Sequence, residues 1–240
     1  MNPELRDIWV YLSTSPLLHL TLTLLAYLGG RWLHRRGGQL ALLNPVLLAV
    51  VCLVTLLWVT DTPYARYFEG AQFVHFLLGP ATVALAIPLY RQLHAVRRSL
   101  PGLLAAITVG SVTASVSAVL IGRLAGTGET VLLSLAPKSA TAPVAMGITE
   151  RLGGLPSLTA VLVILTGILG AMLGPWLLRH VGITDPRAQG LALGTTSHGI
   201  GTARAVQIGE TAAAFSGLGM GLNALATAVL LPLLWHWLAG

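Results

Sequence analysis

The stretch Ser99-Leu-Pro-Gly-Leu-Leu-Ala-Ala-Ile-Thr-Val-Gly-Ser-Val-Thr-Ala-Ser-Val-Ser-Ala-Val-Leu-Ile-Gly122 carries no charged side chain over 24 residues. A helix needs about 20 such residues to cross the hydrocarbon core of a bilayer, so this stretch predicts a membrane-spanning helix. The whole 240-residue chain is similar, with 55% hydrophobic and 9% charged residues. A soluble protein of this length needs more charge to cover its surface. The composition therefore excludes an ordinary soluble domain and indicates an all-α, polytopic integral membrane protein.

Further uncharged stretches predict six to eight membrane segments within one transmembrane domain, residues 1–240. Residues 1–122 are expected to hold four spanning helices, and residues 130–240 two interrupted segments that alternate with two spans. The spans are expected at 8–30, 37–60, 70–90, 99–122, 152–178 and 211–240, and the interrupted segments at 130–149 and 188–209.

The basic residues predict how the chain is oriented. Arginine clusters follow the first and third expected spans, and basic loops favour the cytoplasmic side of a membrane. The net charge of +6 is thus typical of membrane topology and does not indicate nucleic-acid binding. Arg179, His180 and Arg187 also fall on the cytoplasmic side if the first interrupted segment leaves the membrane on the side where it entered, and the second can then re-enter from the cytoplasmic face. We therefore expect two opposed re-entrant hairpins, with fully crossing broken helices as the alternative.

The first interrupted segment contains Pro137-Lys-Ser-Ala-Thr-Ala-Pro143, which includes the only lysine of the chain. Pro137 and Pro143 interrupt the helix and free backbone polar groups. Lys138 costs about 2.5–3.5 kcal/mol at the bilayer centre, so it is expected to face a cavity. Together with the hydroxyls of Ser139 and Thr141, it predicts a carboxylate site. The alternative is that Lys138 extends to the membrane interface and the prolines only end helices.

The second interrupted segment contains Gly194-Thr-Thr-Ser-His-Gly-Ile-Gly-Thr-Ala-Arg204. Its glycines allow a ligand to approach the backbone, and its histidine can donate a hydrogen bond or carry a proton. Arginine provides a fork suited to a carboxylate. The alternative is helix packing through small residues, with Arg204 paired to Glu210. The expected substrate-binding residues are Thr196, Ser197, His198 and Arg204, and the expected backbone or hinge positions are Gly194, Gly199 and Gly201.

The two interrupted segments also resemble each other weakly. Residues 133–145 and 191–203 are identical at four of thirteen aligned positions. Paired interrupted segments in the two halves of a transporter often mark its substrate site. No catalytic residue, metal site or cofactor is expected, because the sequence lacks a nucleophile elbow, a Walker loop and a His-Glu-x-x-His pair.

Three motifs resemble the LrgB/CidB family: residues 78–90, the Pro137–Met146 stretch and the Gly190–Arg204 stretch. The block Ala213-Ala-Phe-Ser216 is similar to the family's Gly-Ala-Phe-Ser block. One departure is Ala142, where members often carry a second threonine. The resemblance covers nearly the whole chain and implies a multi-pass protein of the inner membrane.

The family resemblance implies two functions. One is antiholin-like control of murein hydrolase export and autolysis with an LrgA/CidA-like partner. The other is transport, since related plastid proteins move glycolate and glycerate and bacterial members are linked to pyruvate. The polar residues of the interrupted segments favour a secondary carrier of small monocarboxylates, not an enzyme. We expect its partners to be a small carboxylate, the lipid bilayer and a second copy of the chain.

Overall fold

The computed structural model describes residues 15–38, 43–77, 80 and 83–238, and the chain divides into two compact units, residues 1–83 and 84–240. The described residues form helices and no strands, which confirms the all-α prediction. The start of the first expected span, residues 8–14, and residues 78–79 and 81–82 of the third lie outside the described residues.

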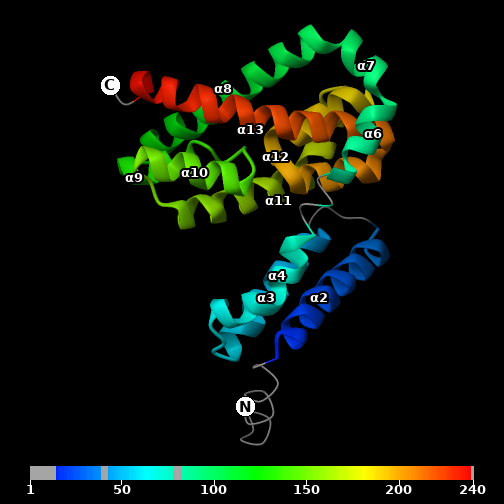
Figure 1. Ribbon diagram of the computed structural model, residues 1–240, viewed down its shortest axis with the longest axis vertical. Helices are drawn as coiled ribbons and strands as arrows, with labels where there is room; N and C mark the ends of the chain where they lie inside the picture. The colour runs from blue at the N-terminus through cyan, green and yellow to red at the C-terminus, as the bar shows by residue number, and fades with distance from the viewer. Residues whose placement is uncertain (1–14, 39–42, 78–79, 81–82, 239–240) are drawn as a thin grey trace, which may run out of the picture. The chain divides into compact units, whose positions relative to one another are not determined.

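Three of the described helices belong to unit 1, and one of them packs against the other two. They are α2 (Pro16–Arg36), α3 (Pro45–Val59) and α4 (Tyr64–Phe76) (Figure 1). The α2 and α3 backbones approach closely at Gly30, where an added Cβ would lie 2.8 Å from the carbonyl oxygen of Pro45. Asn44 begins α3 because its side chain accepts a hydrogen bond from the backbone N–H of Val46 at 2.9 Å.

Three described helices, all in unit 2, are long and apolar enough to cross a membrane: Leu100–Leu124 (α8), Pro156–His180 (α11) and Glu210–His236 of α13 (Glu210–Leu238). This is fewer than the six to eight segments predicted. In the N-terminal unit, α3 is apolar but has only 15 residues, and α2 carries arginines in its last turn. The expected span 70–90 is divided between α4 and α6 (Ala86–Arg91). An uncharged stretch includes loops as well as helix, so its length overestimates the helix.

The first interrupted segment is a helical hairpin formed by α9 (Glu129–Leu135), residues 136–141 and α10 (Ala142–Leu152). Ala136 and Ile148 pack in one buried cluster. An added Cβ on Gly154 would lie 3.0 Å from the Cβ of Leu133. These contacts make the two arms antiparallel, so the hairpin begins and ends on the same side.

The second interrupted segment is also a hairpin, formed by α12 (Pro186–Ile208), whose backbone leaves helical geometry at His198. An added Cβ on Gly201 would lie 2.2 Å from the carbonyl oxygen of Leu193. Eight residues of a straight helix would separate these positions by about 12 Å. Leu193 also shares a buried cluster with Ala205. The chain therefore reverses direction at His198, and both predicted interruptions are confirmed.

The two hairpins approach α11 from opposite ends. The hydroxyl oxygens of Thr149 on α10 and Thr159 near the start of α11 lie 2.8 Å apart. Near the other end of α11, an added Cβ on Gly174 would lie 2.8 Å from the Leu193 side chain of α12. In Figure 1, the green α9 and α10 and the yellow-orange α12 accordingly lie toward opposite ends of unit 2. A hairpin followed by a long helix thus occurs twice with opposite direction, first with α11 and then with α13.

Helix α13 connects the two hairpins along its own length. Its first turns pack on α12, where an added Cβ on Gly190 would lie 2.1 Å from the carbonyl oxygen of Ala212. Its later turns pack on the first hairpin, where Leu231 joins the cluster of Ala136. On another face α13 packs against α8, with the hydroxyls of Ser111 and Thr227 3.0 Å apart.

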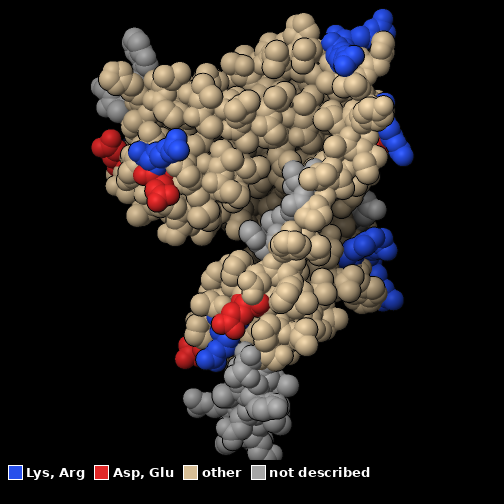
Figure 2. All heavy atoms as spheres, viewed as in Figure 1, with Lys and Arg blue, Asp and Glu red and all other residues tan. Residues whose placement is uncertain are grey.

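Apart from Lys138 and Arg204, the charged side chains of unit 2 lie at or near the ends of its helices. Arg91 of α6 pairs with Glu210, the first residue of α13, at 3.3 Å. Further arginines end α7 (Leu93–Arg98) and α8. Figure 2 shows Lys, Arg, Asp and Glu gathered in small groups around a broad surface without charge. This distribution is typical of helices that face lipid along their length.

Candidate functional site

The tip of the first hairpin is polar and largely buried. Pro137 and Ser139 are almost fully buried, and Lys138 is half-buried. Within the described residues, Lys138 forms no ion pair. Pro143 lies in the first turn of α10, where the missing N–H is tolerated, and Thr141 is the N-cap. The motif therefore places an unpaired cation at the point where the helix is broken.

The start of α10 adds hydrogen-bond donors to this tip. The first backbone N–H groups of a helix have no partner within the helix, and they favour an anion. The Thr141 side chain makes no capping hydrogen bond to them, although it occupies the capping position. A negatively charged group beside Lys138 would thus meet free N–H groups as well as the ammonium.

The tip of the second hairpin is formed by His198. Its backbone has φ 42° and ψ −131°, a conformation that side chains rarely adopt. Its Nε2 lies 2.9 Å from the carbonyl oxygen of Val163 on α11. A carbonyl only accepts, so Nε2 carries the proton in this contact and Nδ1 is the acceptor of the neutral ring. His198 therefore has one nitrogen that holds the tip in place and one that can receive a proton.

Ser197 and Thr196, the two residues before His198, differ in burial. Ser197 is fully buried, and an added Cβ on Gly170 would lie 1.7 Å from its Oγ. Thr196 is exposed and donates its hydroxyl to the carbonyl oxygen of Ala192 at 2.7 Å. Its Oγ1 also lies 3.2 Å from Ser197 Oγ. The predicted serine and threonine are thus linked to each other at the turn.

The predicted glycines of the second hairpin have distinct roles. Gly194 permits contact with α13, because an added Cβ would lie 2.1 Å from the carbonyl oxygen of Ser216. Gly201 permits the reversal described above. Gly199 is exposed, and only the sulfur of Met220 would approach its Cβ, at 4.0 Å. Gly194 and Gly201 are therefore required by packing, and Gly199 is not.

Val163 brings the two hairpin tips together. Its side chain packs in a buried cluster with Ala140 of the first tip and Ala145 of α10. Its carbonyl oxygen accepts the hydrogen bond of His198 from the second tip. Val163 in α11 therefore lies in a buried cluster with the first hairpin and is hydrogen-bonded to His198 of the second, which brings the two interruptions near each other.

Asn223 of α13 also reaches the first tip. It is fully buried, and its Nδ2 donates to the carbonyl oxygen of Ser139 at 3.0 Å. Neither Asn223 nor Val163 stands among the predicted site residues. The sequence signal for Asn223 is an amide within an apolar span, where a polar group is costly unless it has a partner. Val163 acts through its backbone and gives no such signal.

Unsatisfied polar atoms mark the same region. Among the described residues of unit 2, three buried side-chain atoms lack a hydrogen-bond partner: Ser139 Oγ, Thr195 Oγ1 and Asn223 Oδ1. They lie on the first tip, on the second hairpin and on α13, respectively. Buried polar groups without partners are rare and suggest a bound group that satisfies them.

Arg204 lies away from the tip of its hairpin. It is six residues beyond His198, about 9 Å along a helix, and its guanidinium donates to Gln207 Oε1. The proposed pairing of Arg204 with Glu210 is not found, since Glu210 pairs with Arg91. No described contact connects Arg204 with Lys138.

The loop before α12 holds a separate ion pair. Asp185 accepts hydrogen bonds from the backbone N–H of Arg187 at 2.9 Å and from its guanidinium at 2.7 Å. The hydrogen bonds from the Arg187 side chain and backbone hold the pKa of Asp185 below its ordinary value. This exposed pair begins a helix and has no contact with either tip.

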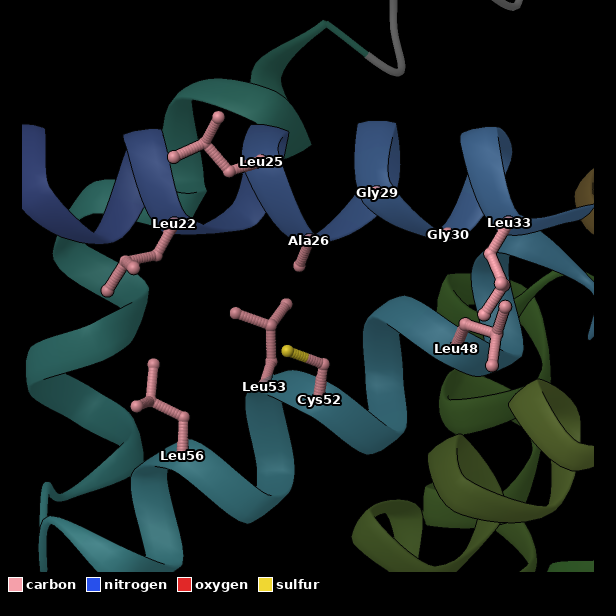
Figure 3. Close-up of a pocket in the computed structure, with 10 residues that line it drawn as sticks. All are labelled: Leu22, Leu25, Ala26, Gly29, Gly30, Leu33, Leu48, Cys52, Leu53 and Leu56. Carbon is pink, nitrogen blue, oxygen red and sulfur yellow. The ribbon is translucent and has the colours of Figure 1, made fainter. Parts of the chain in front are cut away.

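A pocket of about 440 Å³ lies in unit 1 between α2 and α3 (Figure 3). Leucine side chains make up most of its lining, together with alanine, glycine and Cys52. It offers no charged group or strong hydrogen-bond donor to a carboxylate. Among the described residues, no group of three His, Cys, Asp or Glu side chains could hold a metal ion. The hairpin tips are thus the best candidate site for a small anion.

The sequence profile of the LrgB-like family matches residues 23–237. The chain belongs to the LrgB-like family. Among its relatives, it is 36% identical to "Uncharacterized protein YwbG" of Bacillus subtilis (strain 168) over 91% of this chain and 96% of the relative. It is 39% identical to "Uncharacterized protein YxaC" of the same strain over 85% and 88%, respectively. It is 32% identical to "Antiholin-like protein LrgB" of Bacillus mycoides (strain KBAB4) over 92% and 96%.

These matches agree with the apolar helices in identifying this LrgB-like chain as a membrane protein. They also confirm the family expected from the interrupted motifs. No solved structure matches the chain.

Proposed function

We propose that this LrgB-like protein is a multi-pass inner-membrane carrier of small monocarboxylates such as glycolate, glycerate or pyruvate. The convergence of the two hairpin tips at Val163, with Lys138 unpaired beside them, is the observation that carries the proposal. Opposed interrupted segments around a midplane site are the usual construction of secondary transporters.

Lys138 and the free N–H groups at the start of α10 bind the carboxylate in this proposal. Ser139, Thr141, Thr196 and Ser197 provide hydroxyls for the remaining oxygens. Arg204, lower on the second arm, attracts the anion toward the site and does not bind it at the tips. His198 receives a coupling proton at Nδ1, because Nε2 is engaged with Val163.

The movement that carries the substrate is a displacement of the hairpins against their neighbours. Each hairpin enters from one side only, so shifting one tip opens the site to that side. The glycine contacts of α12 with α11 and α13 allow sliding without side chains in the way. Helix α8, which packs against α9 and α12, forms part of the surroundings against which the hairpins move in this proposal.

The second candidate function is antiholin-like control of murein hydrolase export and autolysis. Its support is the printed name of relatives such as the Bacillus mycoides protein. A regulator of this kind acts through another membrane protein, here an LrgA/CidA-like partner, or through a second copy of this chain. It has no need for an unpaired lysine and free N–H groups at converging hairpin tips.

Reconstitution in liposomes distinguishes the two functions. Purified protein is incorporated into vesicles that contain a fluorescent dye, and uptake of radiolabelled glycolate is measured together with dye release. A carrier gives saturable glycolate uptake with the dye retained. Uptake at the level of empty liposomes, with or without dye release, contradicts the carrier and favours the antiholin-like function.

A further inference from the structure

In the side-chain amide of Asn223, the nitrogen Nδ2 has a hydrogen-bond partner, whereas the oxygen Oδ1 is buried without one. Its Nδ2 donates to the carbonyl oxygen of Ser139 at 3.0 Å. Its Oδ1 has no hydrogen-bond partner, although the residue is fully buried. An unsatisfied buried amide oxygen costs about 1–3 kcal/mol, so a partner for Oδ1 would be a considerable gain.

The orientation of this amide follows from its surroundings. Exchanging the two ends would place Oδ1 against the carbonyl oxygen of Ser139, and two acceptors repel each other. The hydrogen bond to Ser139 therefore assigns the nitrogen and the oxygen. An amide oxygen only accepts, so the missing partner must provide an O–H or N–H group.

A carboxylate cannot be that partner, because an ionised carboxylate only accepts hydrogen bonds. The donors for a carboxylate lie one residue before Ser139, at Lys138, and at the start of α10. In the proposed site, Lys138 therefore neutralises the carboxylate of the ligand, and Asn223 contacts another group of the same ligand. A substrate that satisfies both needs an anionic end and a hydrogen-bond donor beside it.

Thr195 of α12 adds a second unsatisfied polar atom near α13. Its Oγ1 is buried without a partner, and an added Cβ on Gly219 would lie 3.2 Å from it. Gly219 precedes Asn223 by one helical turn. The unsatisfied Thr195 Oγ1 therefore lies near α13 one turn before Asn223, which carries the unsatisfied Oδ1. The first hairpin contributes Ser139 Oγ, which is unsatisfied as well.

We infer that Asn223 is a specificity-determining residue, whose Oδ1 accepts a hydrogen bond from a hydroxyl on the carbon next to the substrate carboxylate. The inference rests on the proposed function, because it assigns one group of the same anion site. A methyl group leaves Oδ1 unsatisfied, and a keto oxygen at this carbon repels it. Among the proposed substrates, the site therefore prefers the 2-hydroxy acids glycolate and glycerate, and it binds the 2-keto acid pyruvate, and acids that lack the hydroxyl, more weakly.

Two pairs of compounds test the inference in the wild-type protein. Glycolate and acetate differ only by the hydroxyl, and lactate and pyruvate differ by hydroxyl against keto at the same carbon. Uptake of radiolabelled glycolate into proteoliposomes is measured with each unlabelled compound as competitor. Each hydroxy acid is expected to compete at a concentration about tenfold or more below that of its partner.

Asn223→Ala identifies the residue responsible. We expect this variant to lose most of the preference for glycolate over acetate, because affinity for the hydroxy acid falls more than affinity for acetate. Thr227→Ala is the matched control, since Thr227 is a buried polar residue one turn further along α13 whose partner is Ser111. It is expected to retain the wild-type preference.

The outcomes separate this inference from the proposed function. No uptake of any carboxylate by wild-type protein overturns both. Uptake with equal competition by glycolate and acetate, or with an unchanged preference in Asn223→Ala, overturns the role of Asn223 and leaves the carrier intact. If Asn223→Ala does not fold, as judged by size-exclusion chromatography, the same competition is measured with Asn223→Ser, which also removes Oδ1 and keeps a small polar side chain, and an unchanged preference in that variant overturns the role of Asn223.

Discussion

His198 Nε2 lies 2.9 Å from the carbonyl oxygen of Val163, and this contact joins the tip of the second hairpin to the first third of α11. Val163 also shares a buried cluster with Ala140 at the tip of the first hairpin and Ala145 of α10. Two segments that are nearly sixty residues apart in the sequence thus meet at one position. In the proposed carrier, the substrate binds where these two hairpin tips lie near Val163.

The opposed direction of the hairpins predicts which loops share a side of the membrane. Gly128 and Gly153 flank the first hairpin, and Gly182 and Gly209 flank the second. Single cysteines at these positions, with Cys52 replaced by serine, are labelled in intact cells by a membrane-impermeant maleimide. We expect the first two to react from one side and the last two from the opposite side. Labelling of Gly128→Cys and Gly153→Cys from different sides would show a crossing segment instead of a hairpin.

Close backbone contact predicts that Gly170→Ala destabilises the protein. The added Cβ would lie 1.7 Å from Ser197 Oγ, so the second hairpin must shift away from α11. Overpacking of this kind costs about 1–3 kcal/mol, which exceeds the gain of about 1 kcal/mol from alanine's helix propensity. Thermal unfolding in detergent is expected to begin at a lower temperature than in wild-type protein.

Gly221→Ala is the control for this substitution, because nothing lies within 4 Å of its added Cβ. Its unfolding temperature is expected to equal or exceed that of wild-type protein. A similar loss of stability in both variants would show that α11 and α12 do not pack through Gly170.

The backbone of His198 predicts a difference between two substitutions at the same position. With φ 42° and ψ −131°, glycine relieves a strain of about 1–3 kcal/mol that alanine retains. His198→Gly and His198→Ala both lose the bond to Val163, so their difference reports the backbone alone. We expect His198→Gly to unfold at the higher temperature. Equal stability of the two variants would argue against a reversal of the chain at this residue.

His198→Gly also tests the proposed coupling role of the ring. An inwardly directed proton gradient is expected to increase glycolate uptake by wild-type protein, because Nδ1 receives the coupling proton. In the glycine variant we expect uptake to be insensitive to this gradient. A gradient effect that persists without the imidazole would place the coupling proton on another group.

Much of this architecture follows from residue patterns. Uncharged length predicts α8, α11 and α13, and the prolines and glycines predict two interrupted segments, whose breaks lie at residues 136–141 and at His198. The helices of unit 1 are less predictable, since an uncharged stretch does not reveal at which residue a helix such as α3 begins or ends. The meeting at Val163 could not be predicted, because it depends on a backbone carbonyl and on the direction of each hairpin.

In the candidate site as well, some residues can be predicted from the sequence and others cannot. Lys138, Ser139 and His198 are predictable because charged and polar side chains are costly in an apolar segment and therefore suggest a function. Arg204 fits the same pattern in the sequence, yet its described contact is Gln207 on its own helix. Asn223 lies in α13, whose sequence predicts an ordinary membrane-spanning helix. Its role emerges only from the contact with Ser139.

Binding of the substrate carboxylate by Lys138 is tested by glycolate uptake in proteoliposomes containing Lys138→Gln. Glutamine keeps most of the side chain's length and removes the charge that neutralises the carboxylate. The matched control is Arg151→Gln, which removes an exposed charge near the end of α10. We expect saturable uptake by wild-type and control protein, and uptake at least about tenfold lower in Lys138→Gln. Uptake by Lys138→Gln at the wild-type rate and affinity would contradict this role of Lys138.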